Sequence, residues 1–343
     1  METRKIQSPQ GEITYLSLHG PGGASAVIST YGATLVALEI PGPDGIRDVV
    51  LGYRDPLDYI QDGPNAGKCV GRYANRIARG RFTLDDVEYR LETNLPPSHL
   101  HGGKWGLANR NWTVVSADDS HVRLSYISAD GEEGFPGRLE VTALYEFSSD
   151  EDGRVTLGLT FEATTSRPTV LSLSHHAYFN LSGEPDCLGH VLQLDASRYL
   201  PTDSFLVPTG EYAPVDGTPM DFTRPKTIGR DMDADFRPLR EGKGYDHCWA
   251  VDGEPGTLRR AATLRAGGRS MQVFTTMPGI QLYTGNWLTG SPMDKDGREP
   301  HDYQYVALEC QAFPDSPNRP EFPSTVLRPG ERYLQSIVYK FNS

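Results

Sequence analysis

The sequence of 343 residues has no long apolar run and few cysteines. No uninterrupted apolar stretch approaches the roughly 20 residues that a membrane-spanning helix needs, and residues 1–7 lack the apolar run of a signal peptide. The four cysteines are scattered, without a Cys-x-x-Cys pair, at Cys69, Cys187, Cys248 and Cys310. We therefore predict a protein of the reducing cytoplasm, with no disulfide framework and no membrane partner.

Positive charge is also scarce in this chain. The 33 lysines and arginines are outnumbered by 45 aspartates and glutamates, which gives a formal net charge of −12 and a pI near 5.2. Such a protein is poorly suited to bind nucleic acid or an anionic membrane. No phosphate-binding loop is visible, and the histidines are spread over separate segments without chelating spacing. We therefore expect no nucleotide cofactor and no metal.

The sequence also lacks long amphipathic helices, because no segment longer than about ten residues repeats its apolar residues with the period of a helix. Residues 56–60 form at most a turn or two. Short segments instead alternate apolar with polar residues, at 13–18, 26–30, 34–40, 122–128, 139–147, 155–164, 191–194, 271–276 and 333–341. Clusters of Gly, Pro, Asp and Asn separate them, and no linker or repeat divides the chain. We predict an all-β protein, a sandwich or a barrel, forming a single domain over residues 1–343.

The most informative residue is Glu309, which stands in the otherwise apolar segment 305–313. An ionised carboxylate inside a core costs several kcal/mol unless partners satisfy it. The segment 314–320, rich in Pro, Asp, Ser and Asn, must end this strand. A carboxylate at the end of a buried strand can serve as a general base, and it can equally form an ion pair with an arginine.

Two polar segments in the first third of the chain are candidate binding elements. Arg76, between Asn75 and Ile77, can offer a planar fork of donors to hydroxyls or to a carboxylate. A structural ion pair is the alternative. His101 is followed by two glycines, which let the backbone approach a ligand, and the nearby Trp105 could stack on a sugar face. The alternative is a glycine-rich turn.

Three later segments also interrupt the β pattern. His175 and His176 would face opposite ways on a strand, so at most one of them points into a given pocket. Asp246 stands before a histidine and the start of an aromatic strand. It is either a functional group or a turn residue that caps its own backbone. Gln281 alternates with Tyr283 onto one face, which suits the recognition of hydroxyls as well as ordinary packing.

Together these segments resemble the aldose 1-epimerase family, the galactose mutarotases. The resemblance covers nearly the whole chain in order, through the segments GRYANRIARGRF, HLHGG, SHHAYFNLSG, YDHCW, PGIQLYTGNWL and LECQAFPDSPNRPEFPSTVLRPGERY. It implies a large antiparallel β-sandwich (supersandwich) with few short helices. It also implies interconversion of the α- and β-anomers of free aldoses, without a cofactor.

The resemblance also assigns roles to individual residues. It implies that Glu309 is the general base and His176 the general acid. The residues implied to contact the sugar are Asn75, Arg76, His101, Tyr178, Asp246 and Gln281. Two positions depart from the family pattern, because His175 replaces the usual Asn and Ala312 replaces a His.

The chemistry suits these residues. Opening a cyclic hemiacetal removes a proton from the C1 hydroxyl and delivers one to the ring oxygen, so a base and an acid must converge on one small locus. Three alternatives remain: a hexose-6-phosphate 1-epimerase, a glycoside hydrolase using Asp246 with Glu309, and a non-catalytic carbohydrate-binding protein. The preferred monosaccharide cannot be derived from the sequence, and either a monomer or a homodimer is expected.

Overall fold

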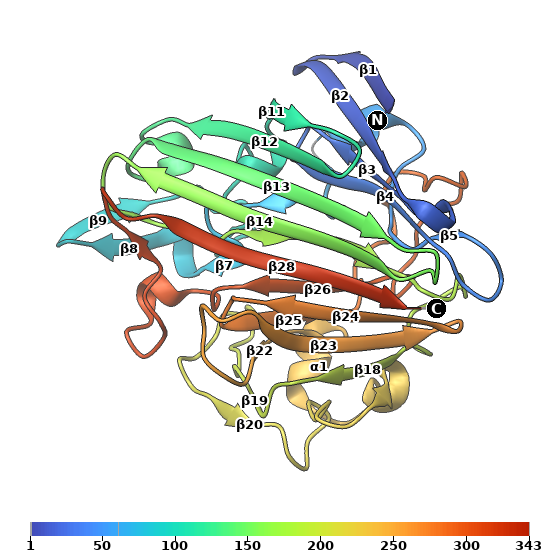
Figure 1. The fold of residues 1–343 in the computed structure, drawn as a ribbon. Helices are drawn as coiled ribbons and strands as arrows, with labels where there is room; N and C mark the ends of the chain where they lie inside the picture. Colours follow the sequence, from blue (N-terminus) through green and yellow to red (C-terminus); the bar gives the residue numbers. More distant parts are fainter. Residues whose placement is uncertain (1, 61, 343) are drawn as a thin grey trace.

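The computed structural model describes residues 2–60 and 62–342, and it is built mainly of antiparallel strands (Figure 1). One α-helix occurs among the described residues, α1 (Arg237–Gly242). Short 3₁₀ turns make up the other helical segments: Pro21–Gly23, Pro56–Tyr59, Ala78–Gly80, Leu107–Asn109, Glu132–Gly134, Ile228–Asp231 and Ser316–Asn318. The predicted all-β class is confirmed.

A nine-stranded sheet forms one layer of the molecule. In spatial order its strands are β11 (Thr113–Ala117), β12 (His121–Ser128), β13 (Leu139–Ser149), β14 (Val155–Thr165), β28 (Tyr333–Asn342), β24 (Arg269–Thr275), β23 (Arg259–Ala266), β18 (Val191–Leu194) and β21 (Lys226–Thr227). Alternate residues of β14 are buried from Val155 to Ala163, because a strand with one face on a core needs apolar side chains at every second position. The last strand of the chain, β28, lies in the interior of the sheet, between β14 and β24.

Two smaller sheets form the opposite layer of the sandwich. The five-stranded sheet contains β1 (Glu2–Ser8), β2 (Gly11–His19), β3 (Ser25–Ser29), β4 (Thr34–Ile40) and β5 (Arg47–Asp48). The six-stranded sheet contains, in order, β17 (Tyr178–Phe179), β26 (Val306–Gln311), β25 (Gly279–Tyr283), β22 (Asp246–Ala250), β19 (Arg198–Tyr199) and β20 (Ala213–Pro214). Residues 49–51 join the two, because Val49 bonds to β4 while Val50 and Leu51 pair with β17. One apolar core contains residues from all three sheets.

Four two-stranded pairs complete the fold. They are β6 (Cys69–Val70) with β16 (Ser174–His175), β7 (Arg76–Ile77) with β10 (His99–Leu100), β8 (Arg81–Leu84) with β9 (Val87–Arg90), and β15 (Thr169–Val170) with β27 (Val326–Leu327).

Each of the nine segments predicted from alternation corresponds to a strand, with ends that differ by at most a few residues. The Glu309 segment forms β26, which ends at Gln311 before the proline-rich turn, as predicted. The helix α1 and strands such as β1 and β23 were not predicted. No helix among the described residues is long and apolar enough to cross a membrane.

Candidate active site

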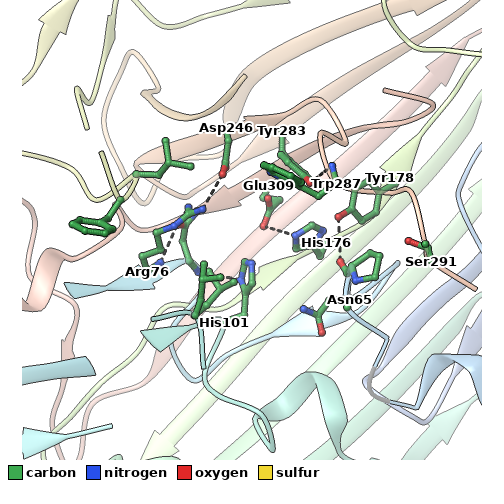
Figure 2. A pocket seen from close by; sticks show the side chains of 18 of the residues that line it. Asn65, Arg76, His101, His176, Tyr178, Asp246, Tyr283, Trp287, Ser291 and Glu309 are labelled. Carbon is green, nitrogen blue, oxygen red and sulfur yellow. Dashed lines mark hydrogen bonds and ion pairs between the residues drawn. The ribbon is translucent and has the colours of Figure 1, made fainter. Parts of the chain in front are cut away.

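A cavity of about 650 Å³ opens beside the six-stranded sheet and contains most of the predicted site residues (Figure 2). Of the eight site residues named from the sequence, seven line the cavity: Asn75, Arg76, His101, His176, Tyr178, Asp246 and Glu309. The eighth, Gln281, is buried and does not line the cavity. The two departures from the family pattern, His175 and Ala312, do not line the cavity.

Strand register explains how residues far apart in the chain meet on one face of this sheet. Glu309 of β26 lies directly opposite Gln281 of β25, and Tyr283 of β25 lies opposite Asp246 of β22. Tyr178 of β17 pairs with Ala307, two residues before Glu309. Directly paired residues and residues two apart share a face, so these side chains point to the same side.

Two short strands supply the opposite wall of the cavity. Asn75 precedes β7 and His101 follows β10, and their main chains are joined because the His101 N–H donates to the Asn75 carbonyl (3.1 Å). The Asn75 N–H donates in turn to Nδ1 of His101 (3.1 Å). Both residues have positive φ, 67° and 52°, a conformation that Asn and His tolerate better than most residues. Nδ1 is therefore an acceptor, and the ring proton of neutral His101 lies on Nε2.

His175 and His176 face opposite ways, as strand alternation predicted. His175 is buried in the core, where Nδ1 lies 3.1 Å from the Tyr339 hydroxyl and Nε2 lies 3.1 Å from the Gly67 carbonyl. His176 faces the cavity, and its ring centre lies 5.1 Å from that of His101.

The centre of the site is a carboxylate facing an imidazole. Oε2 of Glu309 lies 3.5 Å from Nε2 of His176, and the two residues are 2% and 4% exposed. This Glu309 oxygen has no hydrogen-bond partner among the described residues. Arg76, the arginine that lines the cavity, pairs with Asp246 and not with Glu309. Among the described residues Glu309 therefore faces His176 in the cavity and does not form the structural ion pair with an arginine that the sequence left open.

Burial shifts the pKa values of this pair in opposite directions. It raises the pKa of Glu309 to about 8, where the negative charge of Asp246 adds to the rise and Arg76 opposes it. It lowers the pKa of His176 to about 4, where Lys68 adds to the decrease and Asp246 opposes it. Between those two values the pair holds one proton, so one member can donate while the other accepts.

A chain of hydrogen bonds holds Arg76 and Asp246 at one end of the cavity. Arg76 donates through Nη2 to Oδ2 of Asp246 (2.9 Å) and through Nη1 to Oδ1 of Asn75 (3.2 Å). Gln281 donates to Oδ1 of Asp246 (2.6 Å), and its own oxygen accepts from Gln311 (3.4 Å). Burial alone would raise the pKa of Asp246, but Arg76 and these hydrogen bonds hold it below its usual value. Asp246 is therefore a permanent carboxylate.

His101, His176 and Glu309 each offer a ligand atom, and these atoms lie within 4.8 Å of one another. The sequence spacing that argued against chelation is thus not decisive, because folding brings separate segments together. The donor chemistry fits a metal poorly, however. A ligating histidine normally donates its second ring N–H to an acceptor, whereas Nδ1 of His101 faces the N–H of Asn75.

Several lining residues were not predicted. Trp105, the aromatic residue expected to stack on a sugar, does not line the cavity, and Lys104 and Arg110 lie near its ring. Trp287 does line the cavity and is 63% exposed, and its main-chain N–H donates to the Tyr283 hydroxyl (3.1 Å). Trp287 stands near the end of the sequence segment that contains Gln281, but the alternation of apolar and polar residues there does not distinguish it from an aromatic residue packed in the core.

The fold and the site thus define a β-sandwich protein in which a buried glutamate faces a histidine in a cavity of mixed polar and apolar lining. Comparison with known proteins is consistent with this class. The model of the aldose 1-epimerase family matches residues 15–340, and the chain belongs to this family.

Named relatives cover nearly the full chain. A galactose mutarotase from Bos taurus is 39% identical over 319 residues, which is 92% of this chain and 90% of that protein. An aldose 1-epimerase from Escherichia coli K12 is 37% identical over 342 residues, 97% of each. The crystal structure of an aldose epimerase homologue from C. elegans has a TM-score of 0.87 at 28% identity, covering 96% of this chain and 98% of that one.

Proposed function

We propose that this protein is an isomerase that interconverts the α- and β-anomers of free aldoses such as galactose and glucose. The observation that carries the proposal is the Glu309–His176 pair, buried together with 3.5 Å between Oε2 and Nε2. Mutarotation needs a base and an acid on two oxygens bonded to the same carbon, and this pair supplies them within one small locus.

The proton transfers balance within the pair. The pKa values place the single proton of the resting pair on Glu309, and the form that reacts is the one in which this proton has moved to His176. The Glu309 carboxylate then takes the proton of the C1 hydroxyl while protonated His176 delivers one to the ring oxygen, and the C1–O5 bond breaks to give the open-chain aldehyde. Rotation about C1–C2 presents the other face of the carbonyl. Glu309, now protonated, returns its proton to the carbonyl oxygen, and neutral His176 takes the proton from the C5 hydroxyl as the ring closes.

The remaining site residues are proposed to hold the sugar in place. Arg76 and Asp246 present a fixed donor and a fixed acceptor, because each is already oriented by the other. His101 offers its Nε2–H, since Nδ1 is occupied by the N–H of Asn75. Tyr178 forms part of the wall, and Gln281 is proposed to orient Asp246 rather than to touch the sugar.

Polarimetry tests the proposal directly. Freshly dissolved α-glucose, α-galactose and α-xylose should each be followed with and without the protein, after subtraction of the spontaneous rate. We expect acceleration with at least one sugar, and the ranking reports the sugar preference. No acceleration with any of the three would overturn the proposal.

The geometry disfavours the alternatives. A glycoside hydrolase would use Asp246 with Glu309 at the scissile bond, but both oxygens of Asp246 already accept hydrogen bonds, Oδ2 from Arg76 and Oδ1 from Gln281. Release of reducing sugar from disaccharides would distinguish this class. A hexose-6-phosphate 1-epimerase would need an extra basic cluster at the mouth of the cavity, and Arg79 and Arg81, which could supply one, do not line the cavity. A binding protein has no use for a buried carboxylate facing an imidazole, and binding without acceleration would identify one.

The pKa values predict the pH dependence of kcat/KM. The pair must hold one proton, so we expect a bell-shaped profile that falls below about pH 4, where Glu309 and His176 are both protonated, and above about pH 8, where both have lost their protons. An unperturbed histidine acid would place the basic limb near pH ~6.5 instead. A basic limb at that lower value would contradict the coupled pair.

Removal of metal should not affect the reaction. After dialysis against EDTA, we expect the mutarotation rate to be unchanged, because the His101 tautomer opposes metal binding and the mechanism needs only proton transfer. Metal content measured on the same sample serves as the control. Loss of activity that one specific ion restores would contradict the prediction.

We further propose that residues 1–343 act as a single unit in the cytoplasm, as a monomer or a homodimer. The mixture of all three sheets in one apolar core supports the first point, and four buried free cysteines are consistent with a reducing compartment.

A further inference from the structure

A fully buried ion pair lies behind the cavity wall, outside the set of residues to which a role is assigned above. The side chains of Lys68 and Asp62 are both 0% exposed, and they contact each other directly. Lys68 also donates to Oδ1 of Asn109 (3.0 Å). Asp62 accepts from the Tyr53 hydroxyl (2.9 Å) and from the Ala66 N–H (2.8 Å). Burying two charges costs free energy even when they are paired, so a fully buried ion pair beside the active-site cavity is a candidate for a functional role.

The pair closes the loop 62–68, and the end of this loop holds the main chain of His176. The His176 N–H donates to the Lys68 carbonyl (2.9 Å), and the Gly67 N–H donates to the His176 carbonyl (2.9 Å). The Gly67 carbonyl lies 3.1 Å from Nε2 of His175, so the neighbouring histidine fixes the same turn. The position of the His176 imidazole therefore depends on the position of this loop.

The same loop forms part of the cavity wall. Gly63, Pro64 and Asn65 line the cavity, and the Tyr178 hydroxyl donates to the Pro64 carbonyl (3.2 Å). Figure 2 shows Asn65, His176 and Tyr178 on the same side of the site. The path of the loop is tightly constrained at Gly67, where φ is 70° and a Cβ would lie 2.1 Å from the Leu35 carbonyl oxygen.

We propose that the Lys68–Asp62 ion pair is a positioning element for His176, in which the loop fixes the imidazole and the buried ammonium acts on its charge. The inference rests on the proposed function, because it assigns the pair to the acid of that reaction. Lys68 does not line the cavity, so it acts through His176 and does not touch the sugar.

The charges around His176 come from several elements. The titratable groups that face it or act on it are Glu309, His101, Tyr178, Tyr283, Asp246 and Lys68. The two tyrosines stay neutral because burial raises their pKa values. Asp246 favours the protonated imidazole and Lys68 opposes it, so removal of the ammonium has a predictable sign.

The test follows the titration of the His176 imidazole by NMR, together with the pH profile of kcat/KM. Lys68→Met removes the ammonium and leaves Asp62 unpaired, whereas the double variant Lys68→Met/Asp62→Asn removes both charges at similar volume. In both chains we expect the His176 titration and the acid limb to move upward by about one pH unit. Asp62→Asn keeps the ammonium, so it should not raise either one.

Lys226→Met is the matched control. Lys226 is also a buried lysine paired with an aspartate, Asp231, but it does not line the cavity or contact the loop 62–68. Its replacement should change the melting temperature without moving the titration.

The inference is overturned if His176 has the wild-type pKa in a folded chain without the ammonium. It is also overturned if Asp62→Asn raises the pKa of His176 as much as Lys68→Met does. Failure of all three chains to fold would assign the pair to stability alone and would overturn it equally. The NMR titration needs no activity, so a protein without mutarotase activity would overturn the proposed function while this measurement still tested the action of Lys68 on His176.

Discussion

Glu309→Gln should lower the mutarotation rate at least ~10²-fold, because the amide keeps the volume of the side chain but cannot accept a proton. The loss should appear in kcat, since Glu309 acts on the reacting oxygen. The substituted chain should melt no lower than the wild type, because the substitution removes a buried ionisable group that has no cationic partner other than His176.

A rate above about a tenth of the wild-type value, in a chain that melts normally, would rule out Glu309 as the base. Gln281→Glu is not a suitable control, since it would place a second carboxylate beside Asp246. Gln311→Ala is better suited, because Gln311 neighbours the pair on β26 yet contacts only Gln281 among the site residues.

His176→Asn should depress kcat ~10²-fold or more with little change in folding, because the acid that protonates the ring oxygen is lost. The neighbouring residue provides the control. His175→Asn introduces the residue usual in the family, and it should retain most of the activity because His175 points into the core.

The structure adds one expectation to this pair of variants. Asparagine at position 175 is too short to reach both the Tyr339 hydroxyl and the Gly67 carbonyl, so His175→Asn should lower the melting temperature. Rate measurements and thermal melts on both chains separate the two roles. An inactive His175→Asn beside an active His176→Asn would reverse the assignment of the acid.

The long strands were predictable because each has one face on a core, and the alternation of β13 and β14 records that face directly. Arg76 and Tyr178 lie on strands of two residues, β7 and β17, and His101 directly follows another, β10; such strands are too short to show any period. Arg76, His101 and Tyr178 were therefore assigned through the family resemblance and not through pattern.

Other features depend on contacts between distant segments and were out of reach of the sequence. Gln281 and Tyr283 share a face, but only the partners across the sheet show that one supports Asp246 while the other lines the cavity. Lys68 in the sequence resembles any solvated lysine, because its burial follows from the loop that Asp62 closes. The proximity of His101, His176 and Glu309 likewise exists only in the folded chain.

The place of β28 bears on how the protein is made in the cell. This strand is synthesised after the other strands of the described residues, yet it pairs with β14 along nine residues on one side and with β24 on the other. Until it arrives, both neighbours expose unpaired edges, which are sites of intermolecular association. A nascent chain can therefore not complete its nine-stranded sheet until residues 333–342 have been synthesised, and a premature stop before residue 333 would leave an aggregation-prone product although every residue proposed to act in catalysis had been translated.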